Sequence, residues 1–136
     1  MKIIKTLLVF GLLTSPALVL ADGWVAEQGI SHLCAGVGDE SRAQMKTEEG
    51  GSDARLVLTA GPERGFLNDV KLTITSADKQ RSVSWQAQGP ICLLKLPQGN
   101  YTVDASYGDE HHAAELNIKS DKTGTSQPLI FNFKPS

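Results

Sequence analysis

The sequence predicts an all-β fold: an antiparallel β-sandwich of about seven strands, with one short helix near the N-terminus of the mature chain. Beyond that helix, apolar and polar residues alternate with a period of two, as in strands that bury one face. Residues that form turns separate these runs at short intervals, and no helical segment connects one run to the next. The length of 136 residues and the 40% hydrophobic content fit one globular domain.

Residues 1–21 have the features of a secretory signal peptide, and residues 22–136 form the predicted domain. Two lysines precede a short apolar stretch, a proline and small residues, which predicts cleavage between Ala21 and Asp22. An uncleaved anchor helix is the alternative, although the apolar stretch is short for crossing a membrane. No cysteine lies at the cleavage point, so acylation as a lipoprotein is excluded. We expect an exported protein, periplasmic or secreted, without a membrane anchor after cleavage.

The helix is expected after a mostly apolar segment, residues 29–35. Two acidic residues stand at the front of residues 36–46 and Lys46 stands near the end. This order of charges favours a helix, because it complements the helix dipole. A Gly-Gly pair shortly afterwards is predicted to end it.

The strands are predicted from the alternating runs. The clearest candidates are residues 70–75, 82–87, 101–107 and 114–118, and residues 56–58 and 129–133 are further candidates. Residues 91–94, by contrast, are apolar on both sides of the strand. This pattern predicts a strand that is covered on both faces, and it places Cys92 where a disulfide could be buried.

The two cysteines, Cys34 and Cys92, are expected to form one structural disulfide. An even pair in an exported chain most simply forms a bridge. The cysteines are 58 residues apart. A bridge that closes a loop of this length would stabilise the fold by roughly 4 kcal/mol in the chain-entropy model. A redox-active or metal-binding pair is the alternative, but no Cys-x-x-Cys spacing supports it.

The charge of the chain argues against nucleic acid as a partner. The formal net charge is −2, and it becomes about −4 when the two lysines of the leader are removed. No cluster of Lys and Arg remains to contact a phosphate backbone.

A run of polar residues, Asp109, Glu110, His111 and His112, is the strongest candidate for a metal site. Histidine and carboxylate side chains are common metal ligands. Neighbouring residues on a strand point to opposite faces, however, so the two histidines are not expected to converge. A third ligand from His32 would have to come from a distant part of the chain. The alternative is a solvated hairpin end.

Acidic residues around the helix are a second candidate cation site. They lack the alternating spacing of a calcium loop, so surface charge is the other interpretation. These residues are Asp39, Glu40, Glu48 and Glu49.

The aromatic residues allow both structural and binding interpretations. Trp24 could stack on a sugar or cover an edge of the core. Trp85, Tyr101 and Tyr107 fall on the apolar faces of their predicted strands, which favours core packing.

Residues 96–107 resemble the L-P-x-G-x-Y-x-V-x-A signature of carboxypeptidase regulatory-like domains. Residues 69–74 and 129–133 resemble an earlier strand and the closing strand of these domains, and residues 36–45 are similar to a segment of small exported bacterial proteins. The resemblance covers about residues 30–134. It implies a transthyretin-like (prealbumin-like), Ig-like sandwich that serves as an accessory or interaction module without catalytic residues or cofactors.

Enzymatic activity is not expected. Hydrolases built on the transthyretin fold end in Tyr-Arg-Gly-Ser, whereas this chain ends in Phe-Lys-Pro-Ser, and it has no Gly-x-Ser-x-Gly elbow. The sequence therefore predicts a non-catalytic exported accessory module that binds an envelope protein or a glycan, through residues that it does not identify. The alternative is a periplasmic metal-binding protein that uses the cluster from Asp109 to His112.

Overall fold

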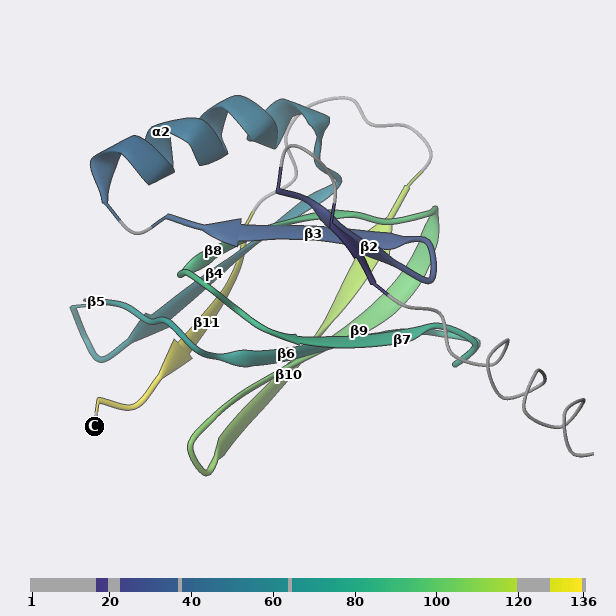
Figure 1. Ribbon diagram of the computed structural model, residues 1–136. Helices are drawn as coiled ribbons and strands as arrows, with labels where there is room; N and C mark the ends of the chain where they lie inside the picture. Colours follow the sequence, from purple (N-terminus) through teal and green to yellow (C-terminus); the bar gives the residue numbers. More distant parts are fainter. Residues whose placement is uncertain (1–16, 20–22, 37, 64, 120–127, 136) are drawn as a thin grey trace, which may run out of the picture.

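Two β-sheets pack face to face in the computed structural model, and the helix α2 (Asp39–Glu48) lies on the outer face of one of them (Figure 1). The structure describes residues 17–19, 23–36, 38–63, 65–119 and 128–135. The predicted all-β sandwich is confirmed. Most of the predicted signal peptide and its cleavage point lie outside the described residues. Within the described ranges, no helix is long and apolar enough to cross a membrane.

The sheet that carries α2, here called sheet A, has the strand order β1-β2-β3-β8-β4-β11, and β5 also pairs with β4. Its pairings are antiparallel except that of β11 with β4, which is parallel. The strands are β1 (Leu18–Val19), β2 (Val25–Glu27), β3 (Ile30–Ala35), β4 (Ala54–Ala60), β5 (Gly65–Phe66), β8 (Ile91–Lys95) and β11 (Leu129–Phe133).

The second sheet, sheet B, has the strand order β10-β9-β6-β7 and is antiparallel throughout. Its strands are β6 (Lys71–Ser76), β7 (Ser82–Gln86), β9 (Gly99–Tyr107) and β10 (Glu110–Ile118). The alternation in the sequence fits this sheet closely, because Leu72 and Ile74 of β6 are fully buried while Lys71 is exposed. The core between the sheets also contains Val103 of β9 and Leu56 of β4.

The described residues form eleven strands, more than the seven or so expected. The additional strands are short: β1 and β5 have two residues each and β2 has three. Such segments are too short to show a period in the sequence. The hairpin between β2 and β3 turns through Gln28 and Gly29, whose φ angles of 53° and 79° suit a tight two-residue turn.

The predicted helix is also confirmed, and its placement explains the doubly apolar strand. Ile91 and Leu93 of β8 point to the outer face of sheet A, where Leu93 and Met45 of α2 pack with Trp24 in a second hydrophobic cluster. Cys92 and Leu94 point into the main core. The strand is therefore covered on both faces, by sheet B on one side and by α2 on the other.

Candidate functional site

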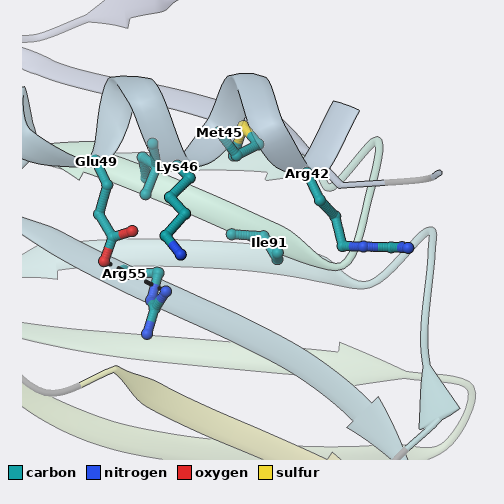
Figure 2. Close-up of a pocket in the computed structure, with 7 residues that line it drawn as sticks. Arg42, Met45, Lys46, Glu49, Arg55 and Ile91 are labelled. Carbon is teal, nitrogen blue, oxygen red and sulfur yellow. Dashed lines mark ion pairs between the residues drawn. The ribbon is translucent and has the colours of Figure 1, made fainter. Parts of the chain in front are cut away.

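A hollow of about 170 Å³ lies between α2 and the outer face of sheet A (Figure 2). The helix and the following turn, η1 (Glu49–Gly51), form one wall, and strands β4 and β8 form the other. Its lining residues are Arg42, Met45, Lys46, Glu49, Arg55, Ile91 and Leu93.

The floor of the hollow is apolar. Met45 and Leu93 are 3% and 1% exposed, respectively, and Ile91 is half-buried beside them. The floor is apolar because alternate residues of β8 face outward under the helix, and these residues, Ile91 and Leu93, are both apolar. It can contact an aliphatic group of a ligand.

The rim of the hollow is charged. Arg55 of β4 lies opposite Leu93 of β8 in the sheet, and an Arg55 Nη1 to Glu49 Oε1 distance of 3.3 Å joins β4 to η1. The Nε atom of Arg55 is buried and has no hydrogen-bond partner among the described residues. Lys46 is exposed and points from α2 toward this ion pair, as Figure 2 shows. No carboxylate of the described chain forms an ion pair with Lys46.

Arg42 belongs to the lining but is engaged elsewhere. It donates to the Asp39 carboxylate at 2.5 Å and to the Gly36 carbonyl oxygen at 3.3 Å. Its guanidinium group also lies 5.9 Å from the ring centre of Phe66. Figure 2 shows it directed away from the ion pair, so the charges available to a ligand are those of Lys46, Glu49 and Arg55.

Trp24 is fully buried beside this site, so of its two alternatives the structure fits packing against the core and not a sugar-stacking surface. Its Nε1 donates to Glu48 Oε1 at 3.0 Å, and the Lys95 ammonium lies 4.1 Å from the ring centre. The indole holds α2 on the sheet, because a helix residue and a strand residue both contact it.

The predicted disulfide between Cys34 and Cys92 is present and joins β3 directly to β8. Trp85 of β7 donates from Nε1 to Cys34 Sγ at 3.1 Å, and its ring stacks on His32 with centroids 4.0 Å apart. Burial lowers the pKa of His32 to about 4. These contacts are between the two sheets, so this cluster supports the packing of the sandwich.

The polar run from Asp109 to His112 lies at the hairpin between β9 and β10. His111 is exposed, whereas His112 faces the other side and contacts the Phe133 ring edge-on, with centroids 4.9 Å apart. His112 Nε2 and Glu110 Oε2 are 2.5 Å apart. His32 is on β3, and two strands of sheet A separate β3 from β11, which carries Phe133. The described residues contain no group of three or more His, Cys, Asp or Glu side chains that could hold a metal ion.

The acidic residues around the helix do not converge on one point. Asp39 pairs with Arg42, Glu48 accepts from Trp24 and Glu49 pairs with Arg55. Each carboxylate therefore has a structural partner, except Glu40, which is exposed at the first turn.

Sequence reasoning did not single out Lys46 and Arg55 as binding residues. The only signal for Lys46 was its place in the last turn of the helix, one residue after an apolar Met45. The only signal for Arg55 was its position on the outward face of a strand with alternating residues. No protein-family model matches the chain, and searches of curated proteins and of solved structures found no match.

Proposed function

We propose that this protein is a non-catalytic exported module that binds an envelope protein or a glycan through the face formed by α2 and the outer side of sheet A. One observation carries the proposal. Met45 is the buried residue of α2, and it belongs to the outer cluster and not to the main core. Sheets A and B enclose the main core without a residue of α2. The helix is therefore not needed to cover that core and can contribute to a binding site.

The architecture supports the resemblance to carboxypeptidase regulatory-like domains as part of this proposal. The two sheets and the short helix α2 fit that type of sandwich. Export is supported by the N-terminal pattern of residues 1–21 and by the disulfide between Cys34 and Cys92, which is typical of an oxidising compartment.

Geometry favours this function over metal binding. His111 and His112 point to opposite sides of β10, and Glu110 is occupied by His112 and the backbone of Lys134. The helix face instead offers a hollow with apolar and charged walls, which is the usual composition of a binding site.

Site-directed photo-crosslinking in the native envelope tests the proposal. A crosslinking amino acid is introduced at the exposed Ala43 of α2, and at the exposed Ser84 of β7 as the control on sheet B. The expected result is one discrete adduct from position 43 and not from position 84. For a glycan partner, the expected result is a specific glycan-binding signal that is lost when Lys46 is replaced by Glu. Equal capture from both positions, or no adduct together with a flat glycan profile, contradicts the proposal.

A further inference from the structure

We infer that the hollow under α2 binds a carboxylate carried on a short aliphatic chain, with the carboxylate between Lys46 and Arg55 and the chain on the apolar floor at Ile91. This inference deepens the proposed function and rests on it for its biological context. Its physical basis is the size, the polarity and the charge of the hollow.

The size of the hollow limits the group that can enter it. Pockets for drug-sized ligands and cofactors measure about 300–1,000 Å³, whereas this one measures about 170 Å³. It therefore accommodates a group the size of one side chain.

The hollow has an apolar end and a charged end. Ile91 is the half-buried residue of the floor, since Met45 and Leu93 beside it are almost fully covered, and an aliphatic chain can be buried against it. Lys46, Glu49 and Arg55 form the other end. A ligand that uses both ends must be amphipathic and short.

The charge of the polar end selects a monoanion. Two cations and one carboxylate leave one net positive charge, since Glu49 pairs with Arg55 at 3.3 Å. A dianion such as phosphate would leave one excess negative charge beside Glu49, and a neutral ligand would gain no charge interaction with Lys46. A carboxylate complements the single charge.

Arg55 provides the second cation. Its Nη1 is used by Glu49, and its Nε is buried and cannot be reached from the hollow. No described residue accepts a hydrogen bond from Nη2, which is therefore the guanidinium nitrogen left for a ligand. A carboxylate oxygen is a strong acceptor for guanidinium N–H groups, so a ligand at this position would accept from Nη2.

The test is a titration followed by amide chemical shifts of ¹⁵N-labelled protein at constant ionic strength. Sodium butyrate is the probe, and butyramide is the uncharged match. We expect saturable shifts in α2 and β8 with butyrate, and at least tenfold weaker binding of butyramide. A second carboxylate probe, N-acetylglutamate amide, carries the same group as a peptide side chain. Tighter binding of this probe assigns the site to an acidic side chain of a partner, and binding of butyrate alone assigns it to a free acid.

Three variants make the titration specific. Lys46→Gln removes the exposed cation, and Arg55→Lys keeps the charge but replaces the guanidinium group by an ammonium group; each should weaken butyrate binding at least tenfold. Lys71→Gln, on the exposed face of sheet B, should leave it unchanged. If Arg55→Lys does not fold, the comparison of Lys46→Gln with Lys71→Gln still decides.

The inference is overturned if neither carboxylate gives saturable shifts, if butyramide binds as tightly, or if Lys46→Gln and Lys71→Gln bind equally well. These outcomes differ from a failure of the proposed function. Specific crosslinking from α2 without carboxylate binding removes the inference alone. Carboxylate binding without any envelope partner removes the proposed function alone.

Discussion

The ring of His32 lies flat against the indole of Trp85, with centroids 4.0 Å apart and planes 7° apart. His32 belongs to sheet A and Trp85 to sheet B, so the stack joins the two layers. The same indole donates to the sulfur of Cys34 at 3.1 Å. The aromatic stack and the hydrogen bond thus join the two sheets next to the disulfide, which lies within sheet A.

The stability of the protein should depend on the pH through His32. Burial lowers its pKa from 6.5 to about 4, so the imidazole is neutral in the folded protein near neutral pH. Below pH 6.5 the unfolded chain binds a proton that the folded chain does not bind. The free energy of unfolding should therefore decrease from pH 6.5 to pH 4, by about 3 kcal/mol in total.

Chemical denaturation of the wild type and of His32→Phe at pH 7 and pH 4.5 checks this prediction. The loss of stability on acidification should be smaller in His32→Phe, which has no imidazole to protonate. Replacement of the exposed His111 by Phe is the matched control, and its loss of stability on acidification should equal that of the wild type. The same pH dependence in wild type and His32→Phe would contradict the assignment.

The disulfide should contribute strongly to stability, because it closes a separation of 58 residues between Cys34 and Cys92. We expect the double replacement of both cysteines by Ala to lower the free energy of unfolding by about 2–5 kcal/mol. Urea denaturation of the wild type and of the double variant measures this difference in the free energy of unfolding. Intact protein should also weigh two mass units less than the reduced chain and resist a thiol-reactive dye. Two freely labelled thiols in folded protein would refute the bridge.

Trp24 should hold α2 on sheet A. Trp24→Ala removes a fully buried indole from the outer cluster and should cost about 3–5 kcal/mol. Trp24→Phe keeps an aromatic ring but loses the hydrogen bond to Glu48, with an expected cost of about 1 kcal/mol beyond the change in volume. Hydrogen exchange should show faster opening of α2 than of β6 in both variants. Uniform acceleration in both elements would contradict the role.

The fold was predictable from the sequence wherever a run was long enough to show its period. Lys71 to Ile74 alternate in the sequence and in their exposure. The short β2 was missed, because three residues do not define a period. The parallel pairing of β11 with β4 was also missed, since alternation fixes which face is buried and not which strand is the neighbour.

The candidate site was less predictable than the fold, for a physical reason. Ile91 and Leu93 indicated that something covers the outer face of β8, and the structure shows that α2 does so. Arg55 enters the site through the register of β4 with β8, in which it lies opposite Leu93. Lys46 enters it through the orientation of α2 on the sheet. Neither relationship is local in the sequence.

The C-terminal end of the chain should be held by Glu110. Its Oε1 accepts from the backbone amide of Lys134 at 2.9 Å, and this hydrogen bond and that with His112 hold the pKa of the Glu110 carboxyl below its usual range. The carboxylate therefore stays ionised as the pH falls below the ordinary glutamate range, and the hydrogen bond is lost when the pH passes the lowered value. Glu110→Ala removes the acceptor and should speed amide exchange at Lys134, while Glu115→Ala on the same strand should not. Unchanged exchange in Glu110→Ala would rule out this contact.

Cleavage of the leader should leave the stability of sheet A almost unchanged. If cleavage follows Ala21, the exported protein begins at Asp22 and lacks β1, which pairs with β2. Leu18 and Val19 are 61% and 75% exposed, so their removal should change the free energy of unfolding by less than about 0.5 kcal/mol. The intact mass of protein from the envelope determines the N-terminus, and urea denaturation of the cleaved and uncleaved chains compares their stabilities. An N-terminus upstream of Leu18 would contradict the predicted cleavage, and a marked loss of stability on cleavage would show that β1 is a working part of the sheet.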